Sequence, residues 1–351
     1  MSIPAASQAW ADLMTSLERV NARLSGKPVD KIPNMNIFMS IIAREAGVSY
    51  SRYAQDYRKL VEGNLICAEK FGLDSVSAIS DPMREASAFG AKVVFPENGV
   101  PYAETNLVTD DILSGKSDLS ILKRFDPLES PRTLDRVKAC ELFREKTGNG
   151  YPVIGWVEGC LAEAADLRGV SELLVDLAGE EEYLDDFFPV IFEQQKRFAK
   201  AQIDAGADFI GIGNAVASLI GPALYQKYGL AWDKAMTDYI HAQGARVKLH
   251  ICGNISSILE LLKQVQPDIL DIDWMVDFGH AVRLFKGTRT AVSGNFNPAG
   301  AILRGSVKEV EDDVKRCIDA GNETTLIAGG CEIPAAVPDE NLLAMDRLLF
   351  I

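Results

Sequence analysis

Short apolar runs alternate with amphipathic helical patterns from about residue 151 to the C-terminus. The runs have the length of buried strands, and the stretches between them repeat apolar side chains at helical spacing. The predicted strands are Pro152–Val157, Asp208–Ile212, Val247–Ile251, Ile269–Ile272, Ala291–Gly294 and Thr324–Ala328. The predicted helices lie around Gly169–Leu177, Glu180–Ala205, Gly221–Gln243, Ile255–Gln264, Asp277–Leu284 and Ser306–Ala320. Such alternation predicts parallel βαβ units.

Two earlier apolar segments, Ile32–Met39 and Ser75–Ser80, can supply further strands. With about eight strand–helix units, the pattern predicts an α/β fold of the (β/α)8 TIM barrel type rather than an open sheet. A dinucleotide-binding sheet would favour a GxGxxG turn after its first strand. Gly211-Ile-Gly213 is too short for that turn and stands too late in the chain. We therefore expect a single barrel domain over residues 1–351.

Two segments depart from the alternating pattern. The amphipathic stretch from Ala11 to Leu24 predicts an N-terminal helical extension within residues 1–30. The stretch from Phe89 to Ser130 is rich in Pro, Gly, Asp and Asn. It predicts a long excursion or a small hairpin over one end of the barrel, where such loops often act as lids.

The charge balance narrows the class of partner. The chain has 50 acidic and 36 basic residues, and no Lys/Arg-rich stripe interrupts the acidic excess. This balance disfavours binding to nucleic acid or to an anionic membrane surface, and it favours a small ligand or a protein partner. The N-terminus lacks the basic start and apolar core of a signal peptide. No apolar segment reaches the roughly 20 residues that span a bilayer, so we expect a cytoplasmic protein.

His250 and Cys252 form the most informative pair in the chain. They flank one residue at the end of a predicted strand, so they lie on the same side of it. Cys331 follows another predicted strand, and a barrel would bring the two strand ends together. Three such ligands with one open position are typical of catalytic zinc, whereas structural zinc is closed by four. A lone histidine is more often a hydrogen-bonded pocket residue. Cobalt or iron could fit, but thiolates with imidazole favour zinc.

The other cysteines and histidines are expected to serve packing or the surface. Cys67, Cys140 and Cys317 fall on helical patterns and read as small buried hydrophobes. Cys160 stands two residues after Glu158 near a strand end, and packing is still the favoured interpretation. A chain of this length and composition is expected to keep its cysteines reduced. The remaining histidines, on helical patterns, are His241 and His280.

Polar residues gather at the C-terminal ends of the predicted strands, where barrel enzymes place their chemistry. They are Glu158, Asn214, His250, Cys252, Asp273, Asn295 and Cys331. Strand parity also turns Lys248 inward, and a buried ammonium requires a carboxylate partner. Asp271 and Asp273 share one face of the next strand, so we predict a buried pair between Lys248 and one of them.

Two carboxylates have alternative interpretations. Glu158 shares strand parity with Trp156 and would form a rim salt bridge, or act as a labile fourth metal ligand or an acid/base group. Asp81, in Ala78-Ile-Ser-Asp-Pro82, would cap the following turn. A ligand contact is its alternative role, for the reason that follows.

Several motifs together resemble the uroporphyrinogen decarboxylase superfamily over nearly the whole chain. They are Ile79-Ser-Asp-Pro-Met83, Ala88-Phe-Gly-Ala91, Pro152-Val-Ile-Gly-Trp-Val-Glu-Gly159, Leu167-Arg-Gly169, Gly206-Ala-Asp-Phe-Ile-Gly-Ile-Gly213, Leu249-His-Ile-Cys-Gly-Asn254, Asp271-Ile-Asp-Trp274, Gly294-Asn-Phe-Asn-Pro298 and Gly330-Cys-Glu-Ile-Pro334. The His-x-Cys pair with a distant Cys is the specific part. It resembles the zinc triad of the corrinoid methyltransferase branch, the methylcobamide:coenzyme M methyltransferases.

The departures from the decarboxylase branch are also informative. Decarboxylases carry an Arg-Gln-Ala-Gly-Arg-Tyr segment that holds a porphyrinogen with many carboxylates, whereas this chain has Asn34-Met-Asn-Ile-Phe-Met-Ser40. The tyrosine expected after the Gly-Trp-Val-Glu-Gly strand is Asp166, and the decarboxylase histidine near Gly330 is replaced by the Cys331 region. Asp81 matches the decarboxylase aspartate. Without the cationic cradle, decarboxylation is disfavoured.

The resemblance implies a zinc-dependent methyltransferase that moves a methyl group between a corrinoid on a partner protein and a thiol such as coenzyme M. In that scheme His250, Cys252 and Cys331 hold zinc, and Glu158 occupies the open position. Asp81 joins Glu158 as a catalytic-site residue. Asn214, Asp273 and Asn295 line the mouth and orient the substrate or the corrinoid. Arg84 is the nearest candidate partner for a sulfonate.

Other functions remain open at this point. The methyl group could pass to tetrahydrofolate or come from a methylated substrate, and a decarboxylase-like lyase or other zinc chemistry could use the same donors. A barrel that holds zinc without catalysis belongs to a different class. The substrate, the direction of transfer and the oligomeric state do not follow from the sequence.

Overall fold

The protein, seen in a computed structural model, is described over residues 14–351. Helix α1 spans Ser16–Leu24, and its N-cap is Thr15, which forms a capping box with Glu18. This helix confirms the C-terminal part of the predicted amphipathic stretch. Its first residues, Ala11–Leu13, and the region weighed for a signal peptide lie outside the described residues.

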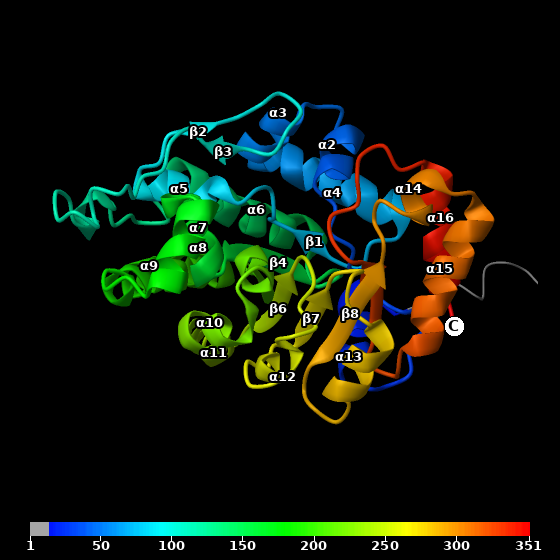
Figure 1. The fold of residues 1–351 in the computed structure, drawn as a ribbon. Helices are drawn as coiled ribbons and strands as arrows, with labels where there is room; N and C mark the ends of the chain where they lie inside the picture. Colours follow the sequence, from blue (N-terminus) through cyan, green and yellow to red (C-terminus); the bar gives the residue numbers. More distant parts are fainter. Residues whose placement is uncertain (1–13) are drawn as a thin grey trace, which may run out of the picture.

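A parallel seven-stranded sheet runs in the order β1-β4-β5-β6-β7-β8-β9 and curls on itself (Figure 1). Its strands are β1 (Val76–Ser77), β4 (Val153–Glu158), β5 (Phe209–Gly213), β6 (Arg246–Ile251), β7 (Ile269–Ile272), β8 (Ala291–Phe296) and β9 (Leu326–Gly329). Helices cover the outside of the sheet. The (β/α)8 barrel prediction is confirmed.

The surrounding helices follow the chain around the barrel. They are α2 (Ser40–Glu45), α3 (Tyr50–Gln55), α4 (Tyr57–Phe71), α5 (Met83–Phe89), α6 (Pro131–Thr147), α7 (Cys160–Arg168), α8 (Val170–Gly179), α9 (Leu184–Asp204), α10 (Gly221–Tyr228), α11 (Leu230–Ala242), α12 (Leu259–Leu262), α13 (Phe278–Phe285), α14 (Ala301–Arg304), α15 (Val307–Ala320) and α16 (Asp339–Leu348). Two 3-10 helices are η1 (Leu119–Ile121) and η2 (Ala215–Ser218). The predicted helix Gly221–Gln243 is divided into α10 and α11 at Gly229, where a side chain would meet the Tyr225 ring.

The predicted strand Ile32–Met39 is wrong as a strand, although the segment lies where a strand was expected. It passes between β1 and the chain after β9: the Asn34 carbonyl accepts from Asp74 N (2.7 Å) and the Ile37 carbonyl from Ile333 N (3.1 Å). The side chain of Asn36 accepts from Gly329 N at 2.7 Å. The side chain of Asn36 takes a hydrogen bond that the backbone of a regular strand would accept. The segment therefore fills the gap between β1 and β9 without being a strand.

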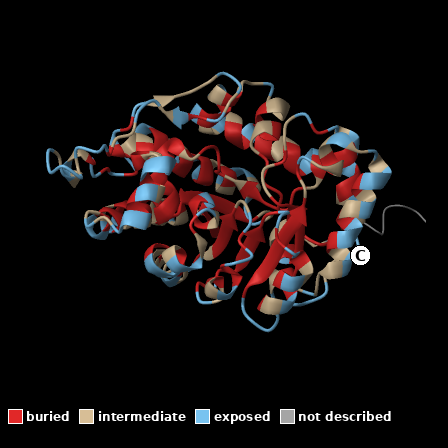
Figure 2. Cartoon of the chain, viewed as in Figure 1, coloured by how far each residue is buried: buried red, intermediate tan, exposed pale blue. Residues whose placement is uncertain are grey.

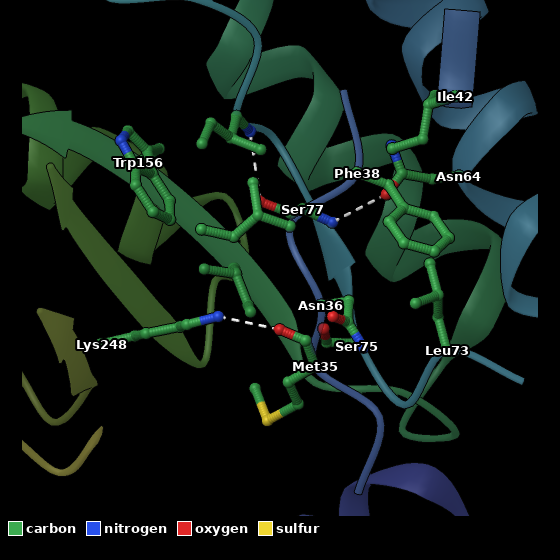
Figure 3. A pocket seen from close by; sticks show the side chains of 13 residues that line it. Met35, Asn36, Phe38, Ile42, Asn64, Leu73, Ser75, Ser77, Trp156 and Lys248 are labelled. Atoms are coloured by element: carbon green, nitrogen blue, oxygen red, sulfur yellow. Dashed lines mark hydrogen bonds between the residues drawn. The ribbon is translucent and has the colours of Figure 1, made fainter. Parts of the chain in front are cut away.

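The strands at the centre of the molecule consist of buried residues (Figure 2). Below the open end, apolar side chains fill the barrel. They are Val20, Met35, Ile37, Ile79, Ile154, Trp156, Phe209, Ile269, Ala291 and Leu326. Trp156 lies across Gly211, where a Cβ would stand 2.0 Å from the indole ring, so only glycine fits at that position. Beside this plug lies a small cavity of about 20 Å³, lined in part by the 35–38 segment, β1 and Lys248. Lys248 Nζ donates to the Met35 carbonyl at 2.9 Å (Figure 3).

The excursion between Phe89 and Ser130 contains the predicted hairpin. Strands β2 (Val93–Val94) and β3 (Tyr102–Ala103) pair antiparallel, and η1 follows. The segment projects from the body of the barrel at the left of Figure 1. In the described part of the chain, no helix is long and apolar enough to cross a membrane.

Candidate metal centre

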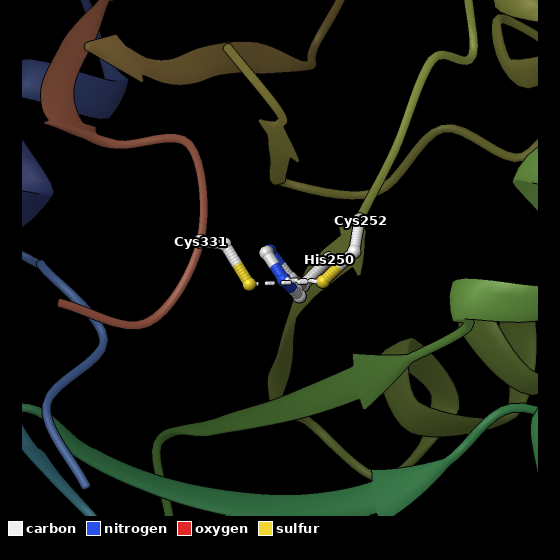
Figure 4. Close-up of side chains that lie close together, drawn as sticks. All are labelled: His250, Cys252 and Cys331. Atoms are coloured by element: carbon white, nitrogen blue, oxygen red, sulfur yellow. Dashed lines mark hydrogen bonds between the residues drawn. The ribbon is translucent and has the colours of Figure 1, made fainter. Parts of the chain in front are cut away.

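Strand β6 and the loop after β9 bring three soft donors together (Figure 4). His250 Nε2 lies 2.8 Å from Cys252 Sγ, which lies 3.1 Å from Cys331 Sγ. The donor atoms of all three residues lie within 4.8 Å of one another. Both cysteines are free thiols. The geometry therefore joins the predicted His/Cys/Cys set across 79 residues of sequence.

The imidazole is oriented from behind by a carboxylate. His250 Nδ1 lies 2.8 Å from Asp271 Oδ2, and Lys248 Nζ lies 3.6 Å from the same oxygen. A carboxylate on Nδ1–H fixes the tautomer that leaves the Nε2 lone pair free for a metal. The predicted buried Lys248–Asp271 pair is confirmed. Asp273 instead accepts from the backbone N of Gly253 (3.0 Å) and of Met275 (3.3 Å).

The protons on His250, Cys252 and Cys331 are distributed so that a divalent metal ion can displace them. The hydrogen bond from Cys252, aided by His250, outweighs burial and lowers the pKa of Cys331 to about 5. The same bond raises the pKa of Cys252. Burial alone would lower the pKa of His250, but Asp271 and Cys331 raise it to about 9. At neutral pH the set holds two displaceable protons, and two thiolates with a neutral imidazole match the ligand preferences of zinc.

A cavity of about 190 Å³ opens beside the three donors at the C-terminal end of the barrel. Its lining includes the predicted residues Asp81, Glu158 and Asn214. The other lining residues are Ile37, Met39, Ile79, Pro82, Trp156, Gly213, Ala215, His250, Cys252, Cys331 and Glu332. The sequence does not single out Glu332, because this residue lies in the loop beyond β9, where strand alternation no longer fixes the direction of a side chain.

Glu158 forms a buried ion pair with Arg84. The Arg84 Nη2 lies 2.7 Å from Glu158 Oε1, and both side chains are nearly or fully enclosed. Burial is the main cause that raises the pKa of Glu158 to about 8, against the pull of Arg84. The salt bridge predicted for Glu158 is thus present, and its role as a metal ligand stays a prediction. Arg84 is 0% exposed and does not line the cavity, so it is not placed to meet a sulfonate.

Asp81 also lines the cavity, and several donors hold its side chain. Its carboxylate accepts from Ser80 Oγ at 2.7 Å, from Met83 N at 3.0 Å and from Arg132. Burial favours the protonated acid, but Arg132 and Arg84 outweigh it and keep the pKa of Asp81 below its usual value. The turn-capping role of Asp81 is confirmed. Its position in the cavity lining is the one that a ligand contact would require, and that contact stays a prediction.

Two predicted mouth residues lie outside the cavity lining. Asn295 donates from Nδ2 to the carbonyls of Asp273 (3.1 Å) and Val276 (2.7 Å). Asp273 in turn organises the loops after β6 and β7 through its backbone contacts. Both residues therefore shape the mouth from behind, and their assignment to substrate or corrinoid binding stays a prediction.

The remaining cysteines are buried, as expected from their patterns. Cys160 donates its thiol to Gln195 Oε1 at 3.0 Å and does not line the cavity. His241 contacts Asp268 at 2.8 Å, and His280 is exposed on α13. The metal-site prediction is thus confined to His250 and the two free cysteines beside it.

Behind Glu158 lies a group of further acidic side chains that the sequence patterns did not reveal. Glu85 Oε1 accepts from Glu158 N at 2.9 Å. Among residues 14–351, neither carboxylate oxygen of Glu163 has a hydrogen-bond partner. Burial, with Glu85 and Asp166 nearby, raises the pKa of Glu163 well above its ordinary value. A carboxyl group in this setting is held in its neutral form.

Replacing Glu163 by Gln is therefore expected to stabilise the protein at pH 8 more than at pH 5. The folded state keeps a proton that the unfolded state loses above about pH 4.3, so stability falls as the pH rises. The proton that only the folded state keeps costs at most about 1.4 kcal/mol for each pH unit above the unfolded-state pKa, and urea unfolding at both pH values measures the gain. Glu141→Gln, on an exposed position of α6, is the matched control. Equal effects of Glu163→Gln at the two pH values would contradict the assignment.

Comparison with known proteins identifies the family of this chain. The uroporphyrinogen decarboxylase (URO-D) family profile matches residues 15–348. The chain belongs to this family. Methylcobamide:CoM methyltransferase MtbA of Methanosarcina mazei is 26% identical over 340 residues, covering 94% of this chain and 96% of that protein. Uroporphyrinogen decarboxylase of Geobacter metallireducens is 25% identical over 345 residues, covering 91% and 94%.

A solved structure of a methyltransferase from Methanosarcina mazei has the same fold. It aligns with a TM-score of 0.82 at 23% identity and covers 95% of this chain and 97% of its own. The family match confirms the resemblance found in the motifs. The fold of the solved structure agrees with that of this chain over nearly its whole length.

Proposed function

We propose that this URO-D family member is a methyltransferase that moves a methyl group between a corrinoid carried by a partner protein and a small thiol. The observation that supports it most directly is the His250/Cys252/Cys331 set at the wall of a cavity at the barrel mouth. The curated relatives named methylcobamide:CoM methyltransferase, at 26% identity and below, support the same reaction class.

The residues at hand fit a zinc ion with three protein ligands. His250, Cys252 and Cys331 would hold it, and Asp271 would keep the imidazole in the required tautomer. When bound, zinc would lower the pKa of a substrate thiol while two thiolate ligands keep the sulfur electron-rich. Glu158 is the proposed occupant of the open position before the thiol enters.

The rest of the cavity positions the reactants. The S–H proton of the thiol is released to solvent at the open end of the barrel, and the sulfur bonds to the methyl carbon. The electron pair of the broken carbon–cobalt bond stays with the corrinoid. Trp156 and Ile79 form apolar walls that exclude water from the sulfur. Asp81 and Asn214 orient the incoming molecule. The corrinoid protein must approach the same open end, because the apolar plug closes the barrel below.

Decarboxylation of an acidic porphyrinogen is the less suitable alternative, although curated decarboxylases are about as similar in sequence. The Asn34–Ser40 segment, expected to carry the cationic cradle, contains no arginine. Within the described residues, the cavity lining also contains no Lys or Arg. A tetrapyrrole with many carboxylates would therefore meet acidic groups where it requires cations.

Metal removal tests the proposal. We expect one zinc per chain by elemental analysis and methyl transfer from methylcobalamin to a small thiol, followed by the corrinoid absorbance change. Chelation should abolish the reaction, and added zinc should restore it. Zinc at one per chain with no methylation of any thiol or folate, and no binding of a corrinoid protein, would refute the methyltransferase function.

A further inference from the structure

The side chains that face the cavity offer hydrogen-bond acceptors rather than positive charge. Three carboxyl groups, from Asp81, Glu158 and Glu332, line it together with the amide of Asn214. In residues 14–351, no lysine or arginine belongs to this lining.

The orientation of the Asn214 amide is fixed from behind. Its Nδ2 donates to both carboxylate oxygens of Asp233 at 2.9 Å, and Tyr225 Oη donates to the same carboxylate at 2.8 Å. A flipped amide would place its carbonyl oxygen against that carboxylate. Asn214 Oδ1 is therefore held as an acceptor. It is buried and has no hydrogen-bond partner among the described residues.

Asn214 and Glu158 follow or end neighbouring strands, and both residues line the cavity. Strands β4 and β5 pair Glu158 with Gly213, and a Cβ at Gly213 would stand 2.9 Å from Glu158 Oε2. A Cβ at Gly159 would stand 2.9 Å from the Asn214 amide carbon. The two glycines thus leave room for both side chains, in a cavity whose lining also includes His250, Cys252 and Cys331.

The nearest cations are engaged elsewhere. Arg84 donates to the Asp81 carbonyl and to Glu158, and Arg132 donates to Asp81 and to the Ala54 carbonyl. Lys248 lies beneath the metal donors, paired with Asp271. Burial of an anion without a cationic partner is strongly unfavourable, whereas a buried acceptor is satisfied by a ligand that brings a donor.

We propose that the cavity selects a small thiol whose other end is a hydrogen-bond donor, a hydroxyl or an ammonium, and disfavours a thiol that ends in a sulfonate or a carboxylate. The inference rests on the proposed function, since it names the substrate class of the same site. It sets this chain apart from relatives whose names give CoM, a sulfonate thiol, as the methyl acceptor.

Three thiols of equal length test the proposal: cysteamine, 2-mercaptoethanol and 2-mercaptoethanesulfonate. Binding is measured from the visible spectrum of the Co²⁺-substituted protein, and turnover from methylcobalamin demethylation. We expect at least tenfold weaker binding and tenfold lower kcat/KM for the sulfonate than for either donor-ended thiol. Tightest binding or fastest turnover of the sulfonate would overturn the proposal.

Variants separate recognition from the intrinsic reactivity of each thiol. Asn214→Leu should lower kcat/KM for 2-mercaptoethanol about tenfold more than it lowers kcat/KM for ethanethiol, which has no donor at its other end. Glu332→Gln keeps an acceptor for Ser40 N and should narrow the discrimination against the sulfonate severalfold. Glu141→Gln, exposed on α6, controls for net charge and should change no ratio. Unchanged ratios in both cavity variants would refute the proposal.

The two readouts keep this inference distinct from the methyltransferase proposal. If the cobalt protein binds the thiols in the expected order but methylates none, the reaction assignment fails and the ligand preference stands. If the sulfonate is methylated best, the reaction stands and the ligand preference fails.

Discussion

Cys331→Ser is expected to remove the metal and to lower methyl transfer by about 10³-fold. Cys331 Sγ is the donor that the loop after β9 contributes, 3.1 Å from Cys252 Sγ. A hydroxyl is a poor substitute for a thiolate toward zinc. Losing the metal removes several kcal/mol of Lewis-acid assistance, and about 4 kcal/mol corresponds to that factor in rate. Metal content and kcat/KM with methylcobalamin measure the effect.

Cys160→Ser is the matched control for this prediction. Cys160 is buried near the cavity, and its thiol donates to Gln195 Oε1 at 3.0 Å. A serine hydroxyl can make the same hydrogen bond, so zinc content and activity should stay within about twofold of the parent. Retention of both zinc and activity in Cys331→Ser would show that the three-donor set is not the metal centre.

The sequence predicted the metal donors because their positions follow from two regular features. Side chains alternate along β6, so His250 and Cys252 point the same way, and parallel strands end at one edge of the sheet. The same parity placed Lys248 inward and identified Asp271 as a candidate partner, although it did not choose between Asp271 and Asp273. The choice depended on the register that sets His250 opposite Asp271.

Other parts of the site follow from contacts that no local pattern encodes. Arg84 and Arg132 reach Asp81 and Glu158 from helices after β1 and the excursion, so their pairing requires the tertiary fold. The Ile32–Met39 segment has the apolar composition of a strand, but Asn36 diverts a ladder bond to its side chain. Sequence periodicity therefore predicted the three candidate metal ligands more reliably than the arginines and the loop segment around them.

Asp271 contacts both Lys248 and His250, so Asp271→Asn should lower both the stability of the protein and the affinity of the proposed metal site. Lys248 is 1% exposed, and loss of its counter-charge would leave a buried ammonium unpaired, at a cost of about 3–5 kcal/mol in the free energy of unfolding. Loss of the carboxylate behind His250 should also weaken zinc binding by about 10–100-fold. Urea unfolding of the metal-free protein and zinc competition against a chelator measure the two effects separately.

The double variant Lys248→Met/Asp271→Asn distinguishes these two roles of the carboxylate. Removing the ammonium together with its partner leaves no unpaired charge at these two positions, so most of the lost stability should return. The imidazole still lacks its carboxylate, so zinc affinity should remain about 10–100-fold low. Recovery of both properties would mean that Asp271 serves only to neutralise Lys248. Recovery of neither would mean that the pair at 3.6 Å contributes little to folding beside the 2.8 Å contact with His250.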